Sequence, residues 1–177
     1  MLTLLSPFTP MLFMGEEWGA RTPWQFFSHF PDAGLREAVR KGRTAEFADH
    51  GWGDVDVPDP NAESTFQDSK LDWTEQEQEP HATLLAMYRE LIALRKAWPE
   101  LSDPWLDEVG VDVHPEARTL VIHRGRLRVL VNLGSEEVAL DLGSTVTRIL
   151  LASEPTTSEG PDITLPGEAF AIAVLAD

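Results

Sequence analysis

The chain of 177 residues contains no cysteine, which excludes disulfide bonds, thiolate zinc sites and cysteine nucleophiles. It is also poor in basic residues, since 14 Lys and Arg stand against 30 Asp and Glu, giving a net charge of −16. Such a chain lacks the basic footprint that nucleic-acid phosphates or an anionic membrane surface would need. We therefore expect no nucleic-acid partner and no membrane partner. The absence of cysteine fits a reducing compartment, so a cytoplasmic location is expected.

Long hydrophobic runs are missing as well. Residues 1–14 are nearly uncharged, but a membrane-spanning helix needs about 20 apolar residues, and this stretch contains Pro7 and Pro10. No Lys or Arg precedes Arg21, so the basic region of a secretory signal is absent. We interpret residues 1–14 as buried core, and the fully hydrophobic start is typical of a sequence that begins inside a larger fold.

Several sequence motifs of enzymes and metal proteins are also absent. The five histidines form no i, i+4 pair, and there is no His-Glu-x-x-His motif, nucleophile elbow, phosphate loop or dinucleotide fingerprint. The acidic stretch 49–79 lacks the spacing of a calcium-binding EF-hand. We therefore expect no metal ion and no cofactor.

Aromatic residues divide the chain into two halves. Five of the six tryptophans lie at or before Trp98, and seven of the eight phenylalanines lie at or before Phe66. The second half is rich in Val, Leu, Ile and Thr. This shift in composition predicts two domains, which comprise residues 1–98 and 99–177.

The first half predicts a mixture of helices and one strand. Apolar residues at 3.6-residue spacing predict helices over 35–50 and 81–97, and residues 1–5 could end another helix. The short apolar run 11–14 has the length of a buried strand. Residues 49–79 carry ten acidic residues and one base, which indicates a long solvated loop.

The second half changes to a period of two, which is typical of strands. Strands are predicted over 119–124, 127–132, 136–141, 148–152 and 169–175, with weaker candidates at 110–114 and 163–165. About seven short strands without helices favour a small antiparallel β-sandwich. The fold class is therefore α/β followed by all-β.

The predicted strand 11–14 runs directly into Gly15, Glu16, Glu17 and Trp18. In parallel α/β folds, functional side chains gather where strands end. In an extended chain, however, the adjacent Glu16 and Glu17 point in opposite directions. They therefore do not form the facing pair of a glycosidase, whose carboxyl groups lie about 5–9 Å apart. The alternative interpretation is a loop with two solvated acids and a packed tryptophan.

A second aromatic group follows, with Trp24, Gln25, Phe26 and Phe27 in succession and His29 close behind. Flat aromatic faces beside an amide suit sugar rings, because the apolar ring face stacks while the hydroxyls need polar partners. We expect Trp18 and Trp24 to contact sugar, and ordinary core positions for Phe26 and Phe27. His29 could bind a hydroxyl or serve the structure.

These motifs together resemble the α-amylase family of glycoside hydrolases. PFTPMLFMGEEWG is similar to the last strand of that family's barrel and the loop after it, and HATLLAMYRELIALRKAWPEL to the closing helix. PWQFFSHF, AVRKGRTAEF and VPDPNAESTFQDSKLDW narrow the resemblance to the trehalose-releasing branch, the trehalohydrolases. Residues 1–98 would then be the C-terminal end of a (β/α)8 TIM barrel, and residues 99–177 the family's β-domain.

The resemblance implies hydrolysis of the α-1,4 bond next to the terminal trehalose unit of a malto-oligosaccharide. The family uses an Asp, a Glu and a second Asp at the ends of barrel strands four, five and seven, and this sequence begins after the seventh. None of the three has a counterpart here, so no catalytic residue is assigned. Catalysis by the chain alone is not expected, and the resemblance implies the missing N-terminal catalytic portion as a partner.

By resemblance, the substrate-binding residues are those of the eighth-strand loop and the rim that follows it. They are Glu16, Glu17, Trp18, Trp24, Gln25, Phe26 and His29. Three alternatives remain open, namely a non-catalytic carbohydrate-binding protein, a purely structural β-module, and a glycogen debranching or branching relative.

Overall fold

The computed structural model describes residues 1–49 and 57–176, and these residues pack as two compact units. One unit combines Met1–Leu12 with Met87–Asp177, and the other comprises Phe13–Ala86. The division falls inside helix α4 (His81–Ala97). The domain boundary predicted at residue 98 separates a β-domain from the end of a barrel that would need more residues than this chain has. The contacts within the chain therefore do not test this boundary, which stays a prediction.

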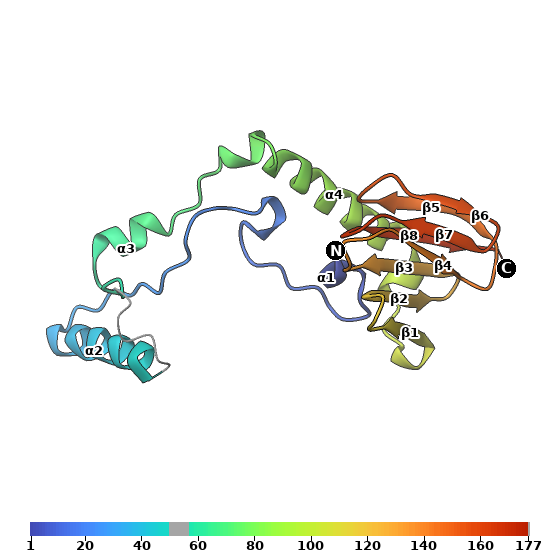
Figure 1. Cartoon of the computed structure of the whole chain (residues 1–177). Helices are drawn as coiled ribbons and strands as arrows, with labels where there is room; N and C mark the ends of the chain where they lie inside the picture. The colour runs from blue at the N-terminus through green and yellow to red at the C-terminus, as the bar shows by residue number, and fades with distance from the viewer. Residues whose placement is uncertain (50–56, 177) are drawn as a thin grey trace. The chain divides into compact units, whose positions relative to one another are not determined.

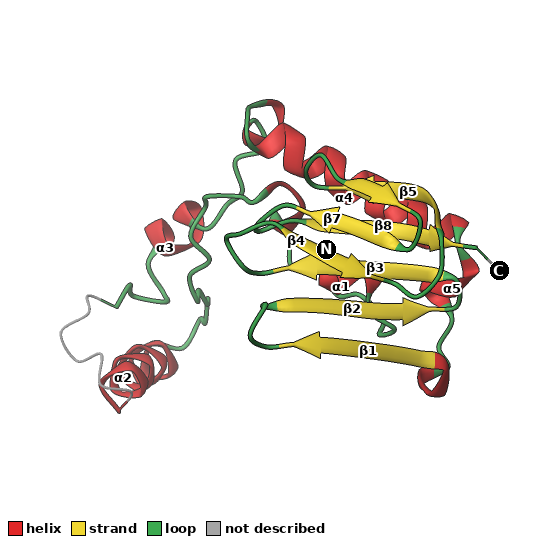
Figure 2. Ribbon diagram, turned by 45° about the vertical axis from the view of Figure 1, so that its right-hand side comes forward, coloured by secondary structure: helices red, strands yellow, loops and turns green. Residues whose placement is uncertain are grey.

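The first unit contains two antiparallel sheets (Figure 2). The larger has the strand order β1-β2-β3-β8-β5 and the smaller has the order β4-β7-β6. The strands are β1 (Val109–His114), β2 (Thr119–Arg124), β3 (Leu127–Asn132), β4 (Val138–Asp141), β5 (Val146–Ala152), β6 (Thr157–Glu159), β7 (Asp162–Leu165) and β8 (Phe170–Leu175). The predicted antiparallel β-structure is confirmed, with β6 as a strand that the sequence pattern did not reveal.

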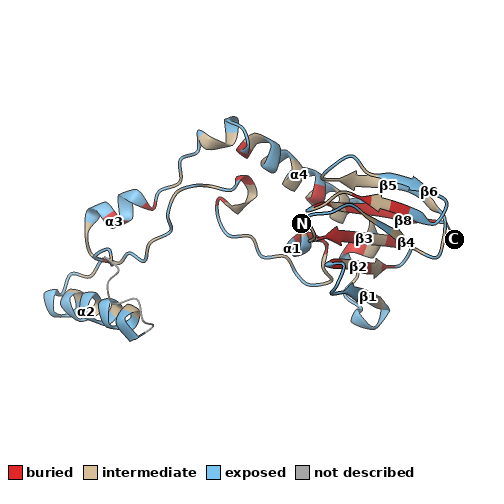
Figure 3. Ribbon diagram, viewed as in Figure 1, coloured by how far each residue is buried: buried red, intermediate tan, exposed pale blue. Residues whose placement is uncertain are grey.

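The larger sheet separates two apolar cores, because successive side chains of a strand point to opposite faces. Ile172 and Val174 of β8 pack in one core with Val129. Ala171 and Ala173 pack in the other core. Since both faces of β3 and β8 are covered, these two strands carry most of the buried residues of the larger sheet (Figure 3).

Each core is completed by a different layer. The first contains Leu4 and Leu5 of α1 (Leu2–Leu5), Leu91 of α4 and Leu101 of α5 (Pro99–Ser102). The second contains Ile163 and Leu165 of β7, from the smaller sheet. The helices thus cover one face of the larger sheet and the smaller sheet covers the other (Figure 1).

The helix over 81–97 is confirmed, and so is the short helix at the N-terminus. The buried strand predicted at 11–14 is wrong for this chain, because no described segment pairs with these residues and Met11 is 86% exposed. A strand without a neighbour has no partner for its N–H and C=O groups. The interpretation of residues 1–14 as buried core holds for Leu4 and Leu5 but fails for Phe8 and Met11.

The second unit contains the helices α2 (Ala33–Asp49) and α3 (Glu63–Asp68) and the 3₁₀ turns η1 (Glu16–Trp18) and η2 (Glu75–Glu77). The helix predicted over 35–50 is confirmed to Asp49, since residue 50 lies outside the described residues. Of the loop predicted over 49–79, residues 50–56 lie outside the described residues, and the remainder is partly wrong because α3 and η2 lie within it. Polar side chains of this segment can be buried because they form hydrogen bonds with the backbone. Ser69 Oγ, for example, donates to the Thr65 carbonyl (2.8 Å).

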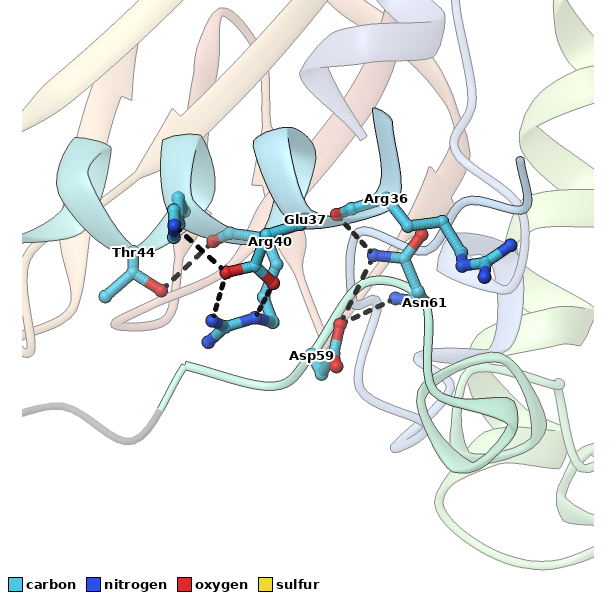
Figure 4. Close-up of polar contacts among 7 residues, drawn as sticks. Arg36, Glu37, Arg40, Thr44, Asp59 and Asn61 are labelled. Atoms are coloured by element: carbon cyan, nitrogen blue, oxygen red, sulfur yellow. Dashed lines mark hydrogen bonds and ion pairs between the residues drawn. The ribbon is translucent and has the colours of Figure 1, made fainter. Parts of the chain in front are cut away.

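Hydrogen bonds join the segment 21–28 to the segment 60–75. Ser28 N donates to Pro60 O (2.8 Å), Gln25 N to Ser69 Oγ (3.2 Å), Thr22 Oγ1 to Lys70 O (3.4 Å) and Arg21 N to Glu75 Oε2 (3.3 Å). Helix α2 is tied to the same framework, because Asn61 Nδ2 donates to the Arg36 carbonyl (3.1 Å; Figure 4). Two segments about 40 residues apart in sequence therefore form one surface.

Among the described residues, no helix combines the length and the apolar character needed to span a membrane.

Candidate functional site

The turn around Glu16 and Glu17 is bounded by two glycines. Gly15 and Gly19 have φ of 85° and 66°, in the left-handed region that favours glycine. A Cβ on Gly15 would also lie 2.7 Å from Ala20 Cβ. Between them the backbone forms the 3₁₀ turn η1, so the extended conformation expected for Glu16 and Glu17 is wrong.

The two carboxylates have different surroundings. Phe13 N donates to Glu16 Oε2 (3.1 Å), and Glu16 N donates to the Phe13 carbonyl (2.9 Å), which closes a reciprocal pair. Glu17 is half-buried, and its carboxylate has no hydrogen-bond or ion-pair partner in the described part of the chain. Glu16 is therefore held in place by its own turn, whereas Glu17 keeps its acceptors for other groups.

Trp18 lies in the interior of the unit. Its side chain is 1% exposed and its ring packs 5.2 Å from that of Trp73. The Trp18 carbonyl accepts a hydrogen bond from Nδ1 of the buried His81 (2.7 Å). The ring has no free face for a sugar in this structure, which places it as a support beneath the turn. No motif in the sequence marks Trp73 or a role for His81.

A cleft of about 340 Å³ opens beside this turn, and we call it the Trp24 cleft. It is lined by Phe13, Met14, Gly15, Glu16, Gly19, Ala20, Thr22, Pro23, Trp24, Ser69 and Leu71. The Trp24 side chain is 61% exposed and stands edge-on to Phe13, with ring centroids 5.4 Å apart. The cleft thus combines an exposed indole, a fixed carboxylate and hydroxyl groups.

Gln25 and Phe26 line a smaller pocket of about 150 Å³ with Trp24 and Arg43. The Arg43 guanidinium lies over the Phe26 ring, 5.2 Å from its centroid, so one face of that ring is covered. His29 lines a third cleft, of about 460 Å³, which we call the Phe27 cleft. The predicted site residues are therefore distributed: Glu16 and Trp24 share one cavity, and His29 belongs to another.

The geometry of the Trp24 cleft suits binding rather than bond cleavage. Glu16 is the one carboxylate among its lining residues, and glycoside hydrolysis needs two carboxyl groups across the scissile bond. Within residues 1–49 and 57–176, no three acidic or histidine side chains cluster in a way that could hold a metal ion. The sequence pattern could not reveal Ser69 and Leu71 as lining residues, because their segment reaches the cleft only through tertiary contacts.

Comparison with known proteins gives consistent matches. Residues 104–172 match the model of a domain of unknown function, DUF3459. The malto-oligosyltrehalose trehalohydrolase of Arthrobacter ramosus is 57% identical over 133 residues, covering 75% of this chain and 22% of that protein. The one from Rhizobium sp. (strain M-11) is 43% identical over 176 residues, covering 99% of this chain and 29% of that protein. The chain thus spans less than a third of the length of these relatives.

Solved structures agree with this picture. A protein from Salmonella typhimurium, described as a candidate α-amylase, is 35% identical with a TM-score of 0.78, covering 98% of this chain and 29% of that chain. The trehalulose synthase of Pseudomonas mesoacidophila MX-45 is 18% identical with a TM-score of 0.60, covering 99% and 37%. The second likeness concerns the fold alone.

Proposed function

We propose that the chain forms the C-terminal part of a trehalose-releasing glycoside hydrolase, because it is similar to malto-oligosyltrehalose trehalohydrolases. The reaction would be hydrolysis of the α-1,4-glucosidic bond next to the terminal trehalose of a malto-oligosaccharide, in the cytoplasm and without a cofactor. The 43% identity to the Rhizobium relative over 99% of the chain supports this assignment.

In this proposal, residues 1–98 are the closing end of a (β/α)8 barrel and residues 99–177 its β-sandwich domain. A complete barrel takes about 250 residues, so most of it would come from an N-terminal portion. The large exposed apolar side chains of the first half support the proposal, since Phe8 is 63% exposed and Met11 is 86% exposed. Barrel strands would cover such side chains, which are unfavourable in water.

The chain would contribute to substrate binding through the Trp24 cleft, and this cleft carries the functional proposal. The exposed Trp24 ring offers a stacking face for a glucose unit, while Glu16 and Thr22 offer acceptors for its hydroxyls. Glu17, Gln25 and Phe26 would extend the polar and aromatic rim, and the buried Trp18 would support the turn from beneath. His29 would contact the substrate separately, from the Phe27 cleft.

We expect no catalysis by the chain alone. No residue of the chain is assigned as the nucleophile or the acid/base, and removing even one member of a catalytic set costs orders of magnitude in rate. A non-catalytic carbohydrate-binding protein is therefore the second candidate, favoured by the observation that every residue lining the Trp24 cleft lies in one compact unit.

Titration of the chain with maltotriosyl trehalose tests the cleft. The variant Trp24→Ala should weaken binding at least tenfold, because covering an aromatic ring contributes about 1.5–3 kcal/mol. Trp105→Ala is the matched control, since Trp105 is a 68% exposed tryptophan of the other compact unit. Equal affinity of the wild-type and Trp24→Ala chains would refute this role for the cleft.

A further inference from the structure

The Phe27 cleft lies at the other end of the framework that carries the Trp24 cleft. Its lining residues are Phe27, Ser28, His29, Pro60, Asn61, Ala62, Glu63 and Phe66. Its volume of about 460 Å³ falls in the range of small-molecule sites. The two clefts share no lining residue.

The floor of the Phe27 cleft is aromatic. The rings of Phe27 and Phe66 meet edge to face, with centroids 5.1 Å apart, and they remain 41% and 38% exposed. Exposed rings held rigidly by each other form a surface on which the apolar face of a ring-shaped ligand can stack. The Lys70 ammonium lies 4.6 Å from the Phe66 centroid and adds a contact that holds that ring in position.

Two residues that line the cleft, Asn61 and Ser28, carry a buried polar atom without a hydrogen-bond partner in the part of the chain that the structure describes. The amide nitrogen of Asn61 donates to the Arg36 carbonyl (3.1 Å) and to Asp59 Oδ1 (3.4 Å), which fixes the amide orientation (Figure 4). Its oxygen, Oδ1, is then left buried without a hydrogen-bond partner among the described residues, and so is Ser28 Oγ. Buried polar atoms of this kind usually mark a place where water or a ligand completes the bonding.

These vacant bonds define the chemistry of the ligand. An amide oxygen needs a donor, which a phosphate or carboxylate cannot supply and a hydroxyl can. Among the described residues, no Lys or Arg lines the cleft, and Glu63 adds a negative charge, so an anion would be repelled. A ligand with an apolar ring face and several hydroxyl groups meets both requirements, and the exposed His29 offers a further hydrogen-bonding group at the rim.

We propose that the Phe27 cleft is a second carbohydrate site, which binds glucose units of the malto-oligosaccharide at a place separate from the Trp24 cleft. The assignment of the sugar rests on the proposed function. The site itself rests on the aromatic floor and the vacant hydrogen bonds, none of which the Trp24 cleft shares.

The test is an NMR titration of the whole chain with maltotriose, following backbone amide signals. We expect two separate groups of shifted signals, one over residues 27–29 and 60–66 and one over residues 13–24 and 69–71. His29→Ala should weaken only the binding of maltotriose at the Phe27 cleft, by up to about tenfold, which is the contribution of one hydrogen bond. His114→Ala, an exposed histidine of the other compact unit, is the matched control.

Phe66→Ala should weaken binding at the Phe27 cleft more strongly than His29→Ala, and the amide spectrum of the variant reports whether the unit remains folded. Shifts confined to residues 13–24 and 69–71 would overturn the second site and leave the proposed function standing. Shifts confined to residues 27–29 and 60–66, unchanged in Trp24→Ala, would support the second site and refute the role of the Trp24 cleft. The absence of sugar-dependent shifts in both regions would overturn both.

Discussion

Arg95 fastens the N-terminal segment to helix α4, and its removal gives a quantitative test of the first unit. Its Nη1 donates to the Leu4 carbonyl (2.6 Å) and the Ser6 carbonyl (3.0 Å), and its Nη2 donates to the Phe8 carbonyl (3.0 Å). The segment also places Leu4 and Leu5 in the core beside α4.

The variant Arg95→Met keeps most of the aliphatic stem and removes the three donors. A hydrogen bond from a charged group contributes about 1.5–3 kcal/mol when buried, and less where water competes. Two of the three hydrogen bonds are partly buried and the third, to Phe8, is exposed. Counting the lower end for the two partly buried bonds alone, we expect a loss of about 3 kcal/mol in the free energy of unfolding. That is a large share of the 5–15 kcal/mol typical of a domain.

Urea denaturation, followed through the amide signal of the core residue Val129, measures this loss. With a slope of about 2 kcal/mol per molar urea, the midpoint should fall by about 1.5 M. Lys96→Met is the matched control, since Lys96 is the exposed next residue of the same helix. A shift of less than about 0.3 M, or one equal to that of Lys96→Met, would refute the reasoning.

Three further variants test other parts of the structure. Hydrogen bonds from Arg40, and then from Lys41, lower the pKa of Glu37 to about 2, so the stabilisation of the fold by the ionised Glu37 should be present above pH 4.5 and disappear as the pH falls towards 2. In Arg40→Gln the titration midpoint of the Glu37 carboxyl ¹³C signal should rise towards 4.5, and an unchanged midpoint would contradict this cause. Leu165→Ala should reduce the free energy of unfolding by about 2–5 kcal/mol because its side chain is fully buried between the sheets, whereas Leu133→Ala, at an exposed position, should change it by less than about 0.5 kcal/mol. Trp18→Ala should cost about 3–5 kcal/mol in the second unit, measured as lost amide protection around His81, and a native level of protection would argue against its supporting role.

Helix α4 could be predicted from sequence with its correct bounds because local signals agree there. Pro80 and Pro99 mark its ends, and Leu84, Leu91 and Ile92 supply the apolar stripe. Strands β2 and β3 were predictable for a similar reason, since alternation and flanking turn residues coincide. Strand β6 was not, because its three residues are all exposed and its conformation depends on pairing with β7.

The candidate site was predictable in part. The sequence indicated that Glu16 and Trp24 would serve one site, and both line the Trp24 cleft. It left open whether Trp18 contacts sugar or packs in the interior, because a tryptophan after two acids has the same pattern in either case. The structure confirms the packed tryptophan. The sequence did not reveal Ser69, which reaches the cleft through a hydrogen bond to a residue 44 positions away.

The central claim is that this chain supplies the C-terminal, substrate-contacting part of a trehalose-releasing hydrolase whose catalytic residues lie outside it. Trehalose release from maltotriosyl trehalose tests it directly, comparing the chain alone with the chain joined to the preceding portion of the Rhizobium relative. We expect no release by the chain alone and release by the joined protein. Release by the chain alone, or none by a folded joined protein, would contradict the claim.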